Sequence, residues 1–143
     1  MKNALQLIRK KSWILISAGL ILAGLCGPLC VVQAQYTTTG KTITQKKFER
    51  MVKKKNTVLL DVRSSDEYKA GHIPNAIQID VLNPDNFKKQ IALLDKNKTY
   101  LVYCRTAKRS KTAMTIMKQS GFTRLYDLKD GFSKWEGAKE KQP

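Results

Sequence analysis

The chain has 143 residues, of which 27 are Lys or Arg and 11 are Asp or Glu, giving a formal net charge of +16. This charge favours small anions or an anionic membrane surface as partners. The lysines are scattered and form no recognition motif, which argues against a nucleic-acid partner.

The first 34 residues are predicted to be a signal peptide. A basic start precedes an apolar stretch at residues 13–26, and small residues before Ala34 suit cleavage after that position. The alternative is an uncleaved membrane anchor, because residues 13–32 carry no charge and would form about 30 Å of helix, enough to span a bilayer. In both cases we expect the domain to be exported to the periplasm or another extracytoplasmic compartment.

Cleavage would leave residues 35–143, a length that suits one domain with one core. The signal segment holds four of the 27 basic residues and no acidic one, so the remaining chain has a net charge of +12. It would contain one cysteine, Cys104, and one histidine, which form neither an internal disulfide nor a usual zinc site. We therefore expect a monomer with a free thiol, no metal and no other cofactor.

The chain then alternates between strand and helix patterns. Residues 35–41 are polar and are expected to be a flexible leader before a domain at residues 42–137. A short strand at residues 42–43 is followed by a helix over residues 45–54, whose apolar positions recur at i, i+3 and i+4. Residues 58–62 are apolar and β-branched and predict a buried strand.

Helix-start signals mark the next two helices. Ser64 with Glu67 three positions later is a capping box that begins a short helix. A third strand is expected at residues 76–79. Asn83 before Pro84 supplies the N-cap and the first position of the following helix.

The second half repeats the alternation, with a strand at residues 99–103, a helix at residues 110–119 and a last strand at residues 123–128. Residues 138–143 are expected to be a loose tail. This order predicts a single α/β domain with a mostly parallel central sheet and helices on both faces. In such sheets, sites lie at the carboxyl ends of the strands.

The cysteine stands at such an end, where a short loop leads straight into a helix. Backbone N–H groups, the helix dipole and three nearby cations create a positive site, in which a thiol is expected to ionise near neutral pH and to act as a nucleophile. The alternative for a lone cysteine after an apolar strand is a small buried hydrophobe. The candidate residues are Cys104 as nucleophile and, for substrate binding, Arg105, Thr106, Ala107, Lys108, Arg109 and Ser110.

Three other residues carry weaker hypotheses. His72 is the only histidine, and a dyad with the cysteine is left open. Asp61 and Arg63 are interpreted as structural, with the guanidinium of Arg63 paired to Asp66 or Glu67. A role for Arg63 at the site is the alternative.

These motifs resemble the rhodanese superfamily in order and spacing, from about residue 43 to residue 135. The resemblance implies a single rhodanese-like domain of the α/β class. Ala107 and Asp130 depart from the glycines usual in the family, and if position 107 needs a positive φ its alanine is strained. The matching stretches are residues 60–63, 67–68, 71–76, 103–110, 121–122 and 130–135.

The resemblance also implies that Cys104 accepts a sulfane sulfur as a persulfide and passes it on. An anionic donor such as thiosulfate would supply the sulfur, and cyanide or a thiol would accept it. Attack on thiosulfate expels sulfite, which leaves without protonation, so no general acid is needed. Arg109 matches the family's loop arginine, and the loop N–H groups with Arg105 and Lys108 would hold the anions.

Two alternatives from other classes are retained. A cysteine phosphatase or arsenate reductase is disfavoured, because four residues separate Cys104 from Arg109 and related phosphatase loops have one more. The tighter loop suits one sulfur atom. A non-enzymatic sulfur carrier or binding module stays open.

Overall fold

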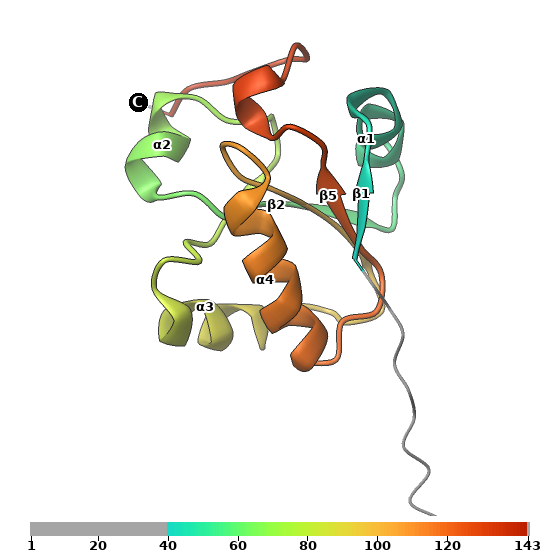
Figure 1. The fold of residues 1–143 in the computed structure, drawn as a ribbon, viewed down its shortest axis with the longest axis vertical. Coiled ribbons are helices and arrows are strands. Elements are labelled where there is room, and N and C mark those ends of the chain that lie inside the picture. Colours follow the sequence, from blue (N-terminus) through green and yellow to red (C-terminus); the bar gives the residue numbers. More distant parts are fainter. Residues whose placement is uncertain (1–39, 143) are drawn as a thin grey trace, which may run out of the picture. The chain divides into compact units, whose positions relative to one another are not determined.

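The computed structural model describes residues 40–142, which fold around one five-stranded sheet (Figure 1). The strand order is β1-β5-β4-β2-β3, and every pairing between these strands is parallel. The predicted α/β class and parallel sheet are therefore confirmed. The strands are β1 (Lys41–Ile43), β2 (Thr57–Asp61), β3 (Ile77–Gln78), β4 (Thr99–Tyr103) and β5 (Leu125–Leu128).

Helices cover both faces of the sheet, as expected from the alternation of strands and helices. Apolar side chains of α3 and α4 pack into one buried cluster, and those of α1 pack into another. Figure 1 shows α3 and α4 next to each other. The helices are α1 (Gln45–Val52), α2 (Ser65–Ala70), α3 (Pro84–Ile91) and α4 (Lys108–Gln119), followed by the 3₁₀ helix η1 (Phe132–Lys134).

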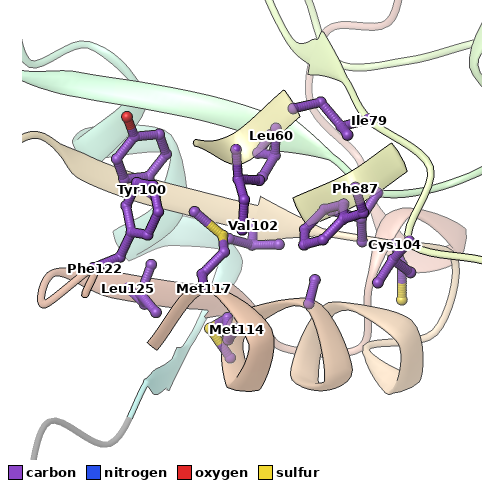
Figure 2. Packing of buried hydrophobic residues seen from close by; sticks show 14 residues of the cluster. Leu60, Ile79, Phe87, Tyr100, Val102, Cys104, Met114, Met117, Phe122 and Leu125 are labelled. Carbon is purple, nitrogen blue, oxygen red and sulfur yellow. The ribbon is translucent and has the colours of Figure 1, made fainter. Parts of the chain in front are cut away.

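Strand β4 supplies side chains to both clusters, because successive residues of a strand point to opposite faces. Tyr100 and Val102 pack with Met114 and Met117 of α4 (Figure 2). Leu101 and Tyr103 belong to the cluster on the other face. The same alternation sends the next residue of the chain, Cys104, to the α4 face of the sheet.

The predicted starts of α2 and α3 are confirmed. Ser64 and Glu67 form the capping box at α2, and the side chain of Asn83 accepts a hydrogen bond from the N–H of Asn86 at α3. Helix α4 begins two residues earlier than predicted, because the left-handed backbone of Ala107 turns the chain directly into the helix.

Other boundaries also differ from the predictions. The first helix ends two residues earlier, at a turn of lysines, and the third and fifth strands are shorter than expected at residues 76–79 and 123–128.

The prediction of a loose tail is wrong for residues up to position 142. His72 and Glu140 exchange two backbone hydrogen bonds, each of 2.9 Å, and the N–H of Gln142 donates to the carbonyl oxygen of Lys69. Figure 1 shows the C-terminus beside α2. The turn after α2 leaves backbone groups that the returning chain satisfies.

The predicted signal peptide or anchor, and the leader up to residue 39, lie outside the described residues. Lys41, the last residue of the expected leader, already belongs to β1. Among residues 40–142, no helix has both the length and the apolar character needed to cross a bilayer.

Candidate active site

Cys104 lies at the carboxyl end of β4, which pairs with β2 on one side and β5 on the other. The loop from Cys104 to Ala107 then enters α4. Ala107 has φ 62° and ψ 7°, so this position does require the left-handed conformation in which alanine is strained. The loop is therefore tight, and it holds the cysteine between a central strand and a helix start.

A turn after β5 clamps this loop from the other side. The N–H of Phe132 donates to the carbonyl oxygen of Cys104 at 2.8 Å, and the N–H of Ser133 donates to that of Arg105 at 3.0 Å. Gly131 has φ 67°, and a Cβ there would lie 2.5 Å from the Arg105 carbonyl oxygen. Only glycine allows this approach.

The sulfur of Cys104 is enclosed, since the residue is 1% exposed. Its Sγ lies 3.5 Å from the hydroxyl oxygen of Ser110, which is itself fully buried in the first turn of α4. Figure 2 shows Cys104 at one end of the cluster that includes Val102 and Phe87. The structure thus brings two of the predicted site residues into contact.

The start of α4 suits an anion. Its N-cap is Ala107, whose side chain caps no N–H group, and its first turn contains no acidic residue. The N–H groups of a first helical turn have no partner within the helix, and they attract negative charge. Arg105, Thr106 and Lys108 are exposed around this helix start, as a substrate-facing role requires.

Arg109 points to a partner that the sequence hypothesis did not include. Its Nη1 and Nη2 donate to the two carboxylate oxygens of Glu67 at 2.6 and 2.7 Å. This hydrogen bonding lowers the pKa of Glu67 to about 2, although partial burial acts in the opposite direction. Arg109 therefore ties α4 to α2, and its contact with a substrate stays a prediction.

Arg63 pairs with Asp61, so the predicted pairing with Asp66 or Glu67 is wrong. Its Nε donates to Asp61 Oδ1 at 2.9 Å, and its Nη2 donates to the carbonyl oxygen of Gly71 at 2.8 Å. The two residues are separated by one position in an extended segment, so their side chains point the same way. Both are buried, which supports the structural interpretation of this pair.

Arg63 nevertheless reaches the neighbourhood of the loop. Its guanidinium carbon lies 4.1 Å from the ring centre of Phe132, the residue whose N–H binds Cys104. A cavity of about 340 Å³ opens here, and both Arg63 and Arg105 line it. Its lining residues are Arg63, Glu67, Ala70, Gly71, Arg105, Phe132 and Ser133.

His72 is engaged elsewhere. Its Nδ1 lies 2.9 Å from the carbonyl oxygen of Tyr68, and its Nε2 lies 2.9 Å from Glu140 Oε1. Both ring nitrogens therefore have partners, so the structure does not form the dyad left open above. Within residues 40–142, no group of three or more His, Cys, Asp or Glu side chains is placed to hold a metal ion.

Asp127 is a buried residue that the sequence hypothesis missed. It is fully buried in β5, and burial raises the pKa of its carboxyl above the usual range. The signal in the sequence that could have pointed to Asp127 was an aspartate within an otherwise apolar strand pattern. Its position beside Val102 depends on β5 pairing with β4, which local sequence does not show.

With this geometry established, the chain belongs to the rhodanese family, since residues 44–138 match the family model described as a rhodanese-like domain. A thiosulfate sulfurtransferase GlpE of Coxiella burnetii is 31% identical over 96 residues, which cover 67% of this chain and 87% of that protein. A rhodanese-like domain protein from Staphylococcus aureus has a similar solved structure, with TM-score 0.63 and 24% identity over 72% of this chain and 99% of that one. This likeness shows the fold.

Another relative carries a different activity in its name. A tRNA uridine(34) hydroxylase of Cytophaga hutchinsonii is 34% identical over 99 residues, which cover 68% of this chain. The match spans only 32% of the hydroxylase. The relatives of this chain therefore include proteins named as sulfurtransferases and proteins named as hydroxylases.

Proposed function

We propose that this protein is a sulfurtransferase that moves a sulfane sulfur from an anionic donor such as thiosulfate to cyanide or a thiol. The observation that carries the proposal is the enclosed Cys104 at the end of β4, facing the start of α4. A cysteine held there lies next to a helix start with exposed cations, which suits an anionic sulfur donor.

The reaction has two displacements. In the first, the Cys104 thiolate attacks the outer sulfur of thiosulfate, the S–S bond of the donor breaks, and sulfite leaves with the bonding electron pair. Cys104 becomes a persulfide with one negative charge. In the second, cyanide attacks the outer sulfur, the S–S bond of the persulfide breaks, and Cys104 keeps the electron pair as a thiolate while thiocyanate is released. Both leaving groups are stable anions, so no acid is required.

The loop can hold these anions without a metal. The first-turn N–H groups of α4 would stabilise the persulfide, as an oxyanion hole stabilises an oxygen anion. Arg105 and Lys108 would attract the donor. Arg105 lines the cavity beside the loop, and there it could bind the sulfonate group of thiosulfate.

Coverage of the relatives favours this activity over hydroxylation. The chain spans 87% of the sulfurtransferase relative and 32% of the hydroxylase. The four-residue spacing between Cys104 and Arg109 also favours a single sulfur over a phosphate. A sulfur carrier that does not catalyse turnover is the remaining alternative. The intact-mass experiment below distinguishes such a carrier from an enzyme.

The test is the conversion of thiosulfate and cyanide to thiocyanate. The wild-type protein should catalyse this conversion. Cys104→Ser should abolish catalysis, because the serine hydroxyl does not form a persulfide. Thr115→Ala, on the exposed face of α4, is the matched control and should keep wild-type activity. Turnover that persists in the serine variant would refute the proposal.

Intact mass separates enzyme from carrier. After thiosulfate treatment, the protein should gain the mass of one sulfur, located on the Cys104 peptide, and cyanide should remove it. A stable gain that cyanide does not remove would favour a carrier. No gain, together with no thiocyanate, would exclude sulfur transfer from thiosulfate.

We also propose that the protein works outside the cytoplasm as a monomer, with its cationic surface able to rest on an anionic membrane. The support is the N-terminal pattern and the net charge of residues 35–143. Fractionation of expressing cells would test this. Recovery of the protein only with cytoplasmic markers would contradict export.

A further inference from the structure

The end of the sheet opposite Cys104 is formed by three short connections and the start of β1. Strands β1, β2, β4 and β5 are parallel, so their amino ends lie at one edge of the sheet and Cys104 lies at the other. The connections that lead into β2, β4 and β5 are residues 53–56, 92–98 and 120–124. The surface of these connections, together with Lys41, is called the basal face below.

Backbone and side-chain contacts join the three connections into one surface. The N–H of Thr99 donates to the carbonyl oxygen of Asn56 at 3.0 Å, and the next N–H along β4 donates to that of Arg124 at 2.8 Å. A Cβ on Gly121 would lie 3.7 Å from the side chain of Lys96, so this lysine lies beside the third connection. The basal face is therefore continuous.

This face carries a large share of the positive charge. Its segments contain seven Lys or Arg and one acid, Asp95, so their net charge is +6, which is half of the +12 of residues 35–143. None of the ion pairs found in residues 40–142 includes one of these cations. All are exposed or half-buried. They are Lys41, Lys53, Lys54, Lys55, Lys96, Lys98 and Arg124.

Two further features suit a lipid surface. The helices that lead into the connections have Arg50, Lys88, Lys89 and Lys118 in their last turns. Leu93, in the connection before β4, is 87% exposed, the most among the large hydrophobic residues of the described chain. Peripheral proteins bind a bilayer interface through cations that attract anionic headgroups and through apolar side chains that enter the acyl boundary.

The chain outside the described residues also joins the domain at this face, at Lys41. The apolar stretch predicted as signal or anchor ends at residue 32, and the eight residues from 33 to 40 span at most about 29 Å. A retained anchor would therefore keep the basal face near the bilayer. A nucleic acid is a poorer match, because the connections expose no aromatic side chain on which bases could stack.

We propose that the basal face docks this protein on an anionic lipid bilayer, with the Cys104 loop turned toward the solution. The inference rests on the membrane association proposed above, to which it adds an orientation, and it does not depend on sulfur transfer. Strand β4 separates the two ends by five residues, about 16 Å, which exceeds the Debye length of about 8 Å at physiological ionic strength. The bilayer charge would therefore attract the basal cations without repelling an anionic donor from the loop.

The experiment is acetylation of the full-length chain, followed at each lysine by mass spectrometry. The vesicles contain phosphatidylcholine alone or with about 30% phosphatidylglycerol. With phosphatidylglycerol, Lys96 and Lys98 should react at least about fivefold more slowly than with phosphatidylcholine alone, and about 0.5 M NaCl should remove the difference. Lys134, in η1 beside the active-site loop, should react equally with both kinds of vesicle.

A triple variant tests whether the basal cations cause this protection. With Lys53→Gln, Lys54→Gln and Lys55→Gln together, the protection of Lys96 should fall below about twofold, because half of the net charge of the face is removed. These three side chains are exposed, so the fold should not change.

The matched control removes the same charge from the opposite end, where three exposed lysines lie after β5, in η1 and in the tail. This variant should keep the protection of Lys96. It carries Lys129→Gln, Lys134→Gln and Lys141→Gln. An equal loss of protection in the two triple variants would show that only the net charge matters, and it would overturn the proposal.

Three further results would also overturn the proposed docking. The first is acetylation of Lys96 that does not respond to phosphatidylglycerol, and the second is equal protection of Lys96 and Lys134. The third is protection of Lys96 by soluble polyglutamate but not by the vesicles, which would assign the basal face to an acidic protein.

Acetylation does not require sulfur transfer, so the two proposals can fail separately. Thiocyanate production without protection of Lys96 would refute the docking face and leave the sulfurtransferase assignment standing. Protection of Lys96 without thiocyanate production would do the reverse.

Discussion

Ala107 introduces backbone strain into the active-site loop. It is one of three non-glycine residues with positive φ among residues 40–142, together with Asn75 and Asp130. Asn and Asp tolerate this conformation better than alanine, because their short polar side chains form local hydrogen bonds. The strain at position 107 is therefore the least compensated of the three.

We predict that Ala107→Gly stabilises the fold. Relief of the left-handed strain exceeds the entropy cost of glycine, leaving a gain of about 1 kcal/mol in the free energy of unfolding. Urea denaturation would measure it. Ala113→Gly, the same change inside α4, should be destabilising instead, and a destabilising effect of Ala107→Gly would contradict the strain argument.

The ion pair between Glu67 and Arg109 should stabilise the fold by an amount that falls at acid pH. The pKa of Glu67 is about 2 in the folded protein against a usual value of 4.5, chiefly because Arg109 hydrogen-bonds to it. Its stabilisation is therefore complete above pH 4.5 and is lost as the pH falls toward 2. The gap in unfolding free energy between wild type and Glu67→Gln should shrink over this range.

Denaturation at several pH values would measure that gap. Glu136→Gln is the control, because Glu136 is exposed and belongs to none of the ion pairs found in residues 40–142. The difference in unfolding free energy between Glu136→Gln and wild type should be smaller than that between Glu67→Gln and wild type. A gap for Glu67→Gln that stays constant from pH 6 to pH 2 would argue against the ion pair.

At the scale of elements, the site consists of a strand end, a helix start and a turn from a third element. Strand β4 and helix α4 position the cysteine, and the turn before η1 holds the loop through the carbonyl oxygens of Cys104 and Arg105. Gly131 allows the close approach. The loop shape therefore depends on two chain segments that are 28 residues apart, as the hydrogen bond from Phe132 to Cys104 shows.

We predict that Gly131→Ala disrupts this turn. Its new Cβ would meet the Arg105 carbonyl oxygen at 2.5 Å, and its φ of 67° disfavours alanine. The expected cost is at least about 2 kcal/mol of stability, with loss of sulfur transfer. Gly40→Ala is the control, because the closest contacts of its Cβ would be with the flexible end of the Met114 side chain. Equal effects of the two substitutions would contradict the clamp.

At the scale of the whole molecule, positive charge should concentrate anionic donors near the loop. Residues 35–143 carry a net charge of +12, and Arg105 and Lys108 are exposed at the site. Salt screens such attraction over a Debye length of about 10 Å at 0.1 M. Donor binding should therefore weaken as ionic strength rises.

We predict that the KM for thiosulfate rises about threefold or more between about 20 mM and about 500 mM NaCl, while kcat changes little. Arg105→Ala should raise the KM at low salt and reduce its salt dependence. Lys129→Ala, which removes a charge after β5, is the control. A KM that does not respond to salt would show that the charge has no role in donor binding.

Much of the fold was predictable because its signals are local. The apolar run of residues 99–103, the capping box of Ser64 and the Asn83-Pro84 pair each specify an element through neighbouring residues, and each prediction is confirmed. The position of Cys104 at a strand end followed from the same signals. The N-terminal predictions concern residues outside the described part of the chain.

The partners of the side chains were less predictable. Arg109 was assigned to substrate and meets Glu67, Arg63 was paired with the wrong acids, and the tail at Glu140 was expected to be loose. Each of these contacts depends on the direction of a long side chain or a returning chain end. Such directions follow from packing between elements and not from sequence spacing.

By itself, the sequence determined the order of strands and helices, the strand-end cysteine and the cationic loop, because periodicity and capping act over a few neighbouring residues. Only the tertiary structure decided which groups surround the sulfur. The side chain of Ser110 meets the sulfur only when α4 packs against the end of β4, and the turn at Gly131 closes on the loop. Contacts between distant segments form when the sheet assembles and buries them together, so no local pattern records them.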